Sequence, residues 1–203
     1  MGKTTLAMKL ILQVFRIQVD RIIVVCPTYQ QKTYDDLRPL VNDRDVYSDV
    51  SEKTLEHIWQ LLLLNSKTNS PQRILLLLDD VAGSKEVYAK RTGTFAKIAI
   101  QTPHWNVSLM ILSQQPTSVA PAFRQNAENI IIFPCEGQQD FDWIKKAYQS
   151  IAMEHKNIKN VVLYAWRGGL SDNTEWGLHF LFIRTLPRQH THFYLDFTHE
   201  IVF

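Results

Sequence analysis

The chain has 203 residues, of which 45% are hydrophobic and 21% charged, and its formal net charge is +2. This composition is typical of a globular protein, and the near-neutral charge excludes a basic tail that coats nucleic acid. The two cysteines, Cys26 and Cys135, form no CxxC pair, so neither a disulfide framework nor a zinc site is expected.

The first two-thirds of the chain alternates helices with apolar strands. Apolar residues at three- and four-residue spacing predict a helix at 4–15, and a continuous apolar run predicts a strand at 22–26. A second helix is expected from Ser51 onward. Further strands are expected at 74–78, 107–112 and 129–133, and further helices at 94–101 and 141–151. Strands that are apolar throughout are typical of a parallel sheet covered on both faces, so we predict an α/β fold.

The pattern changes in the final third. Short apolar segments predict strands at 161–166, 178–184 and 193–197. We interpret them as an antiparallel extension of the same sheet, within one domain over 1–203 that has an α/β core at 1–157 and a β extension at 158–203. No membrane span is expected, because every apolar run is far shorter than the roughly 20 residues that cross a bilayer.

The segment Gly2-Lys3-Thr4-Thr5 stands directly before the first predicted helix. It matches the second half of the phosphate loop GxxxxGK[ST], in which backbone amides cradle phosphates, the lysine reaches the β- and γ-phosphates, and the hydroxyl binds Mg²⁺. A GKT triplet also occurs often by chance. Its place at the start of an amphipathic helix is the one that phosphate binding requires.

Asp79 and Asp80 close the apolar strand at 74–78. An acid at the end of a buried strand can hold Mg²⁺ opposite a phosphate loop, and the following acid can orient or deprotonate the attacking water. The alternative is a strand that ends in a solvated acidic turn. One helix–strand–helix unit separates Lys3 from Asp79, and this order suits a phosphate-loop ATPase.

Two further polar positions follow later elements. Ser113-Gln114 ends the strand at 107–112, where Gln114 would sense the γ-phosphate or the water, unless it is only a polar strand end. Arg124 precedes the strand at 129–133 and would reach the nucleotide of a neighbouring subunit as an arginine finger. The alternative for Arg124 is a structural role, paired with Glu128 or with a carbonyl group.

Two other groups of residues could bind a metal ion or DNA, and each also has an ordinary structural explanation. His190 and His192 form a His-x-His pair that is suited to a metal ion but is more often solvated or packed on aromatic rings. Lys85, Lys90 and Arg91 would contact DNA phosphates if their loop faced a central pore, and would otherwise be ordinary solvated surface.

Taken in order, these motifs resemble those of the genome-packaging ATPases of large DNA viruses, the poxvirus-type branch of the FtsK/HerA superfamily. The likeness runs from Gly2 to about Phe133. Its blocks are GKTT at 2–5, Val25-Cys26-Pro27-Thr28 with Tyr34 downstream, Leu77-Leu78-Asp79-Asp80, His104-Trp105-Asn106-Val107-Ser108, Ser113-Gln114, and Pro121-x-x-Arg124-x-Asn126.

The resemblance implies a RecA-like (ASCE) P-loop NTPase fold, with a mostly parallel sheet flanked by helices. It also implies site roles by position. Gly2, Lys3, Thr4 and Thr5 would bind ATP, Thr4 and Asp79 would serve Mg²⁺, Asp80 would be the catalytic acid, Gln114 the sensor, and Arg124 the finger.

The resemblance further implies a motor that pumps double-stranded DNA into a viral capsid. A homo-oligomeric ring would hold the duplex by its phosphates without reading sequence, and would dock on a capsid vertex or portal. The expected location is the host cytoplasm, in a viral factory, or the virion, with the nucleus left open. Two alternatives are another FtsK/HerA-like translocase or helicase-like ATPase, and an inactive truncated paralogue that serves as an interaction subunit.

The sequence departs from the family pattern at two places. Pro103 stands where the family has an arginine before the His-x-Asn block, so an arginine role there is lost or moved. The family also places a buried strand before the phosphate loop, flanked by the strands at 107–112 and 129–133. Neither this strand nor the first glycine of the loop is present, and we therefore expect Met1 to be an internal start.

Overall fold

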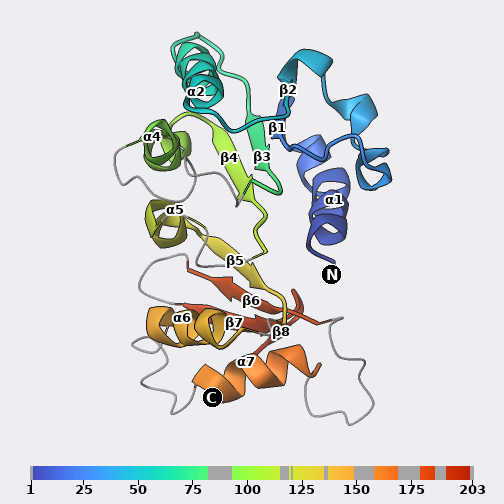
Figure 1. Ribbon diagram of the computed structural model, residues 1–203, viewed down its shortest axis with the longest axis vertical. Coiled ribbons are helices and arrows are strands. Elements are labelled where there is room, and N and C mark those ends of the chain that lie inside the picture. Colours follow the sequence, from blue (N-terminus) through green and yellow to red (C-terminus); the bar gives the residue numbers. More distant parts are fainter. Residues whose placement is uncertain are drawn as a thin grey trace. The chain divides into compact units, whose positions relative to one another are not determined.

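The computed structural model describes residues 2–81, 93–114, 119, 121–134, 137–148, 158–168, 179–185 and 191–201. These residues fall into two compact units, 2–126 and 127–203 (Figure 1). None of the helices within the described ranges is both long and apolar enough to cross a membrane.

A four-stranded parallel sheet forms the centre of the first unit. Its strands are β1 (Arg21–Val25), β2 (Val46–Tyr47), β3 (Ile74–Leu78) and β4 (Val107–Ile111), in the spatial order β2-β1-β3-β4. Val25 pairs with Leu78, and Leu78 pairs with Ile111, so β1, β3 and β4 end in register at one edge of the sheet. All five residues of β3 are buried, which explains their uniformly apolar character.

Helices cover both faces of this sheet (Figure 1). On one face α1 (Lys3–Gln13) packs Ala7, Met8 and Ile11 against Leu75 and Leu77 of β3. The other face is covered by α2 (Glu52–Ser66), α4 (Thr94–Gln101) and Phe123 of α5 (Pro121–Asn126). Short 3-10 turns complete the unit at Phe15–Ile17, Lys32–Tyr34, Arg38–Leu40, Asp43–Asp45 and Thr102–His104.

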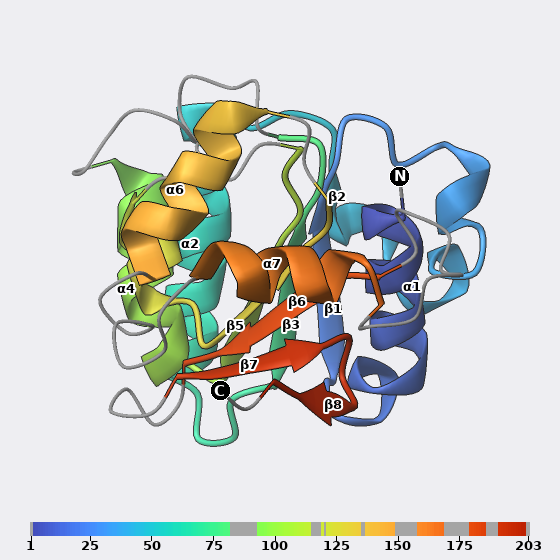
Figure 2. The same ribbon diagram turned by 90° about the horizontal axis from the view of Figure 1, so that it is seen from below.

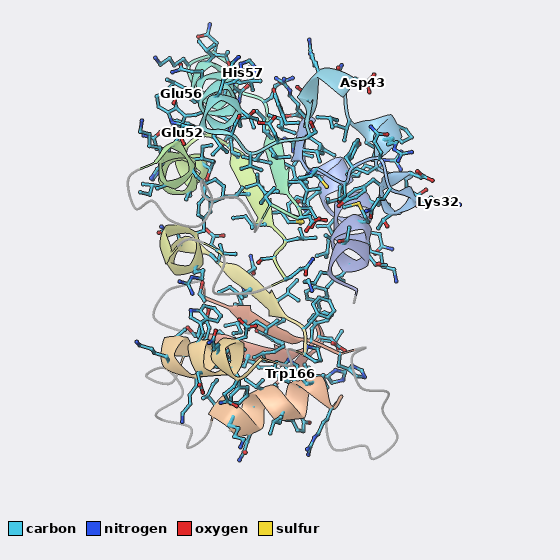
Figure 3. All side chains as sticks on the ribbon, viewed as in Figure 1. Lys32, Asp43, Glu52, Glu56, His57 and Trp166 are labelled. Atoms are coloured by element: carbon cyan, nitrogen blue, oxygen red, sulfur yellow. The ribbon has the colours of Figure 1, made fainter. Side chains whose placement is uncertain are left out.

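Polar contacts fix the start of two of these helices. Ser51 caps α2, because its hydroxyl accepts a hydrogen bond of 3.2 Å from the Thr54 amide. The Thr94 hydroxyl, in the first turn of α4, donates to Glu52 at 2.6 Å and to Glu56 at 3.1 Å. Figure 3 shows these two glutamates on α2, and their bonds join α2 to α4.

The second unit has an antiparallel sheet with helices on one face. Its strands are β5 (Asn129–Ile132), β6 (Leu181–Arg184), β7 (His192–Leu195) and β8 (His199–Glu200), in that spatial order. Helices α6 (Gln138–Tyr148) and α7 (Ile158–Trp166) lie on the same face of the sheet (Figure 2). Trp166 is buried in the core between them (Figure 3), and its indole N–H donates to the Ile132 carbonyl at 3.1 Å.

The structure corrects two expectations in this unit. Residues 161–166, predicted as a strand, lie in helix α7. Ile158, Val161, Val162, Ala165 and Trp166 form the buried face of that helix. Among the described residues, β5 and the later strands form a sheet of their own instead of extending the parallel sheet. The other predicted elements are present within a few residues of their expected bounds, and the single domain over 1–203 stays a prediction.

Candidate functional site at the carboxyl edge of the parallel sheet

The predicted acidic pair lies where β3 leaves the sheet. The Asp79 amide donates to the Val25 carbonyl at 3.0 Å, and the Leu112 amide donates to the Leu78 carbonyl at 2.9 Å. These bonds continue the β1–β3–β4 ladder by one residue, so the segments after all three strands begin at the same edge. Asp79 is only 6% exposed there. In open α/β sheets this edge is where ligands bind.

A hydrogen bond joins the GKTT segment to this acid. The Thr4 hydroxyl, in the first turn of α1, donates to Oδ2 of Asp79 at 3.1 Å, across 75 residues of sequence. The structure therefore brings together the helix start and the acidic strand end that the sequence analysis assigned to one site. Hydroxyl and carboxylate oxygens are hard ligands of the kind that Mg²⁺ prefers, so this pair fits the predicted metal position.

The start of α1 is suited to an anion. Gly2 is the N-cap residue, with a φ of 106° that side-chain-bearing residues rarely adopt, and it makes no side-chain cap. Among the described residues no side chain caps the first amides of the helix, which is the arrangement that binds phosphate oxygens. Lys3 is half-buried and makes no hydrogen bond or ion pair with any described residue, and Thr5 is exposed.

Tyr34 is a second hydroxyl donor to Asp79, and no role was predicted for it. Its hydroxyl donates to the same Oδ2 atom at 2.6 Å and accepts a hydrogen bond from the Cys26 thiol at 3.2 Å. Burial of the ring, together with the hydrogen bond to Asp79, raises the pKa of Tyr34. The phenol therefore stays protonated and remains a donor at neutral pH.

Arg38 holds the loop that carries Tyr34. Its guanidinium pairs with Asp35 at 2.6 Å and donates to three consecutive backbone carbonyl groups. These acceptors belong to Tyr29, Gln30 and Gln31, at 3.4, 2.6 and 3.1 Å. Arg38 thus binds the loop between β1 and Tyr34 at three consecutive carbonyl groups, which restricts the movement of Tyr34 relative to Asp79.

Asp80 and Gln114 lie at the same edge but are exposed to solvent. Asp80 has a φ of 57°, a left-handed conformation that turns the chain away directly after Asp79. Gln114 follows the end of β4, and β4 is in register with β3. Exposure at this edge is what a group that meets a bound phosphate or water requires. The catalytic roles of these two residues stay predictions.

Arg124 lies apart from this cluster within the first unit. It is on α5, which packs on α4 through the rings of Phe95 and Phe123, whose centroids are 4.0 Å apart. Helices α4 and α5 cover the face of the sheet opposite to α1 (Figure 1). The structure therefore does not bring Arg124 to the Thr4–Asp79 pair of its own chain, and a contact with a neighbouring subunit stays a prediction.

The remaining candidates show ordinary contacts or lie outside the described residues. His192 pairs with Glu200, and His199 lies 2.7 Å from the Thr198 hydroxyl. In the ranges that the structure describes, no three His, Cys, Asp or Glu side chains form a group that could hold a metal ion. His190, Cys135 and the segment 82–92, which contains the basic loop residues, lie outside those ranges.

The fold is similar to that of viral genome-packaging NTPases. The genome packaging NTPase B204 of Sulfolobus turreted icosahedral virus 2, in complex with ATP-gammaS, has a TM-score of 0.63 and 18% identity, with 100% of this chain and 93% of B204 covered. The B204 complex with AMPPCP has a TM-score of 0.59 and 17% identity, covering 99% and 94%.

A third structure is B204, the DNA-packaging ATPase from Sulfolobus turreted icosahedral virus, with a TM-score of 0.61 and 17% identity, covering 99% of this chain and 94% of that one. No protein-family model matches the sequence, and neither does any curated protein. The similarity over nearly the whole length defines the class of fold: this is the α/β fold of the P-loop packaging NTPases.

Proposed function

We propose that this chain is an ATP-hydrolysing motor subunit that packages double-stranded DNA into a viral capsid. The observation that carries the proposal is the hydrogen bond between Thr4 and Asp79. It joins a helix start suited to phosphate with a buried acid suited to Mg²⁺, in a fold that resembles B204 structures in complex with ATP-gammaS and AMPPCP.

The residues of the site suit each part of phosphoryl transfer to water. The Lys3 amine and the first amides of α1 would bind the β- and γ-phosphates. Thr4 and Asp79 would hold Mg²⁺, which supplies positive charge against the charge that develops on the γ-phosphate. Asp80 would orient or deprotonate the attacking water, and Gln114 would contact the γ-phosphate or that water.

The finer assignment rests on the motif order. It supports the poxvirus-type branch of the FtsK/HerA superfamily, a homo-oligomeric ring with ATP between subunits, and Arg124 as the residue that reaches the neighbouring nucleotide. Duplex DNA would be held by its phosphates, and a capsid vertex or portal would anchor the ring. The place of action would be the host cytoplasm, in a viral factory, or the virion, with the nucleus left open.

The test is ATP hydrolysis by the purified chain, with and without linear duplex DNA. We expect Mg²⁺-dependent hydrolysis that duplex DNA stimulates. We expect Lys3→Ala to abolish it, because the β- and γ-phosphates would then lack the lysine side chain that binds them. Lys9→Ala is the matched control, since Lys9 is an exposed lysine on the same helix and should leave the rate unchanged.

Three outcomes separate the alternatives. Hydrolysis that persists in Lys3→Ala would overturn the phosphate-loop assignment. Lys3-dependent hydrolysis without any effect of duplex DNA would favour an ATPase of another role. Absence of both nucleotide binding and hydrolysis in the wild-type chain would favour an inactive interaction subunit.

A further inference from the structure

We propose that Tyr34 is a positioning residue for the metal site, which holds the Asp79 carboxylate in the orientation that Mg²⁺ binding needs. The inference rests on the proposed function of the same site. It assigns a role to a buried hydroxyl that lies 45 residues from the acid in sequence and that nucleotide chemistry itself does not require.

The hydrogen bonds fix which oxygen of Asp79 is available. Both the Tyr34 and the Thr4 hydroxyl groups donate to Oδ2, and among the described residues no group donates to Oδ1. Two donors on one oxygen restrain rotation of the carboxylate about its Cβ–Cγ bond. The other oxygen is left to accept from a metal-bound water or to bind the metal.

The two donors, Thr4 and Tyr34, differ in whether bound nucleotide and metal would also use their hydroxyl groups. Thr4 belongs to the helix start that would bind phosphate, and its hydroxyl, which donates to Asp79, would also have to serve the metal. The Tyr34 hydroxyl is 2.6 Å from Asp79 and belongs to a buried ring on a different segment, the 3-10 turn Lys32–Tyr34, which is not part of the GKTT segment. Tyr34 can therefore hold the carboxylate whether or not nucleotide is present, which is what a preorganised site requires.

The surroundings of Tyr34 restrict its ring. The Cys26 thiol donates to its hydroxyl, and the ring of Tyr29 packs at a centroid distance of 5.3 Å. Arg38 binds the carbonyl groups of the preceding loop, and Tyr34 itself is only 2% exposed. Because these contacts restrict the Tyr34 ring, its hydroxyl can orient the Asp79 carboxylate, as the outer partners of metal ligands do.

A purely structural tyrosine would share the burial and the packing, so the test must isolate the hydroxyl. Tyr34→Phe removes only that oxygen and keeps the ring. Tyr29→Phe is the matched control, because Tyr29 is a buried tyrosine of the same cluster whose hydroxyl has no hydrogen-bond partner within the described residues. Neither substitution alters a residue of the GKTT segment at 2–5.

The measurement is the affinity for a fluorescent, non-hydrolysable ATP analogue, first in EDTA and then across a Mg²⁺ series. We expect Tyr34→Phe to raise the Mg²⁺ concentration at half-effect by about 10- to 100-fold, the usual loss when an outer partner of a metal ligand is removed. The affinity in EDTA should stay at the wild-type value. Tyr29→Phe should match the wild type in both conditions. Electron paramagnetic resonance of Mn²⁺ gives the same comparison without fluorescence.

Each outcome decides a different point. An unchanged Mg²⁺ dependence in Tyr34→Phe, or an equal shift in Tyr29→Phe, overturns the positioning role and leaves the proposed function standing. A wild-type chain that binds the analogue without any Mg²⁺ dependence, or not at all, overturns the proposed function and this inference with it.

A readout on the unmodified protein covers the case in which Tyr34→Phe fails to fold. Tyrosine labelled with ¹³C at Cζ reports the hydrogen bonding of each phenol. Addition of Mg²⁺ to the analogue-bound chain should shift the assigned Tyr34 resonance and leave that of Tyr29 in place. A Tyr34 resonance that does not respond to Mg²⁺ overturns the inference.

Discussion

Asp79 shows at the scale of single residues what sequence order can predict and what it cannot. Its pairing with Thr4 follows from the order of two motifs, because a helix start after GKT and an acid after a buried strand meet at one sheet edge in this class of fold. Tyr34 belongs to one block of the family resemblance, but no role follows from its position in the sequence. It lies in a polar stretch without periodicity, and only the fold of the loop that Arg38 binds brings its hydroxyl to the acid.

Removal of the Tyr34 hydroxyl should also change stability. A hydrogen bond to a charged group contributes about 1.5–3 kcal/mol, so we expect Tyr34→Phe to lower the free energy of unfolding by about that amount. Tyr29→Phe should be neutral or slightly stabilising, because it removes a buried hydroxyl that has no partner within the described ranges. Urea unfolding of the three proteins gives the comparison, and an equal loss in both variants would contradict it.

At the scale of elements, the strands were predictable where they are apolar throughout, and α7 was not. The run Val161–Trp166 is apolar and partly β-branched, which suits a strand, and six residues are too few to separate a strand from a buried helix by periodicity. The deciding residue is Ile158, because the spacing from Ile158 through Val161, Val162 and Ala165 is that of one helix face. That face packs against the antiparallel sheet, and the sequence of the segment alone does not show that such a sheet is there to cover it.

The starts of β1 and β3 are joined by an exposed pair whose effect depends on pH. The Asp20 amide donates to the Arg73 carbonyl, and the Arg73 amide and guanidinium donate to the Asp20 carboxylate at 2.8 to 3.2 Å. These bonds lower the pKa of Asp20 from 3.8 to about 2. A lowered folded-state pKa stabilises the fold above the unfolded pKa, and this contribution is lost as the pH falls from about 4 to about 2.

We therefore expect Asp20→Asn to reduce the acid sensitivity of the fold. The wild type should lose more stability than the variant between pH 5 and pH 2.5, when urea midpoints are compared. The pair is exposed, so its effect should shrink at high salt. An NMR titration of the Asp20 carboxyl carbon gives the pKa directly, and a midpoint near 4 in the folded protein would contradict the prediction.

At the scale of the whole molecule, the candidate site lies within one of the two units. The residues of the candidate metal and phosphate site, from Gly2 to Asp79, all belong to the unit 2–126. Strand β4 lies at the edge of its sheet, and β5 lies at the edge of the other. These are the two strands that the family resemblance places on either side of one strand. From the sequence we find no residues for that strand, and among the described residues β4 and β5 belong to separate sheets.

This division makes ligand-induced stabilisation informative about domain structure. ATP with Mg²⁺ at about 100 times its dissociation constant should add about 2.7 kcal/mol to the folded state. For a chain of this size that corresponds to a rise of about 5–10 °C in the unfolding midpoint. Lys3→Ala should show no rise, and Lys9→Ala should behave as the wild type.

The shape of the calorimetric transition then tests the single domain predicted over 1–203. Because the ligand contacts would lie only in the unit 2–126, two independent domains should give two transitions, of which ATP moves one. A single cooperative domain should give one transition that moves as a whole. We expect the single transition, because we interpret 1–203 as one domain from the sequence. Two transitions with only one sensitive to ATP would replace the one-domain prediction by two domains, with the ATPase site assigned to the first.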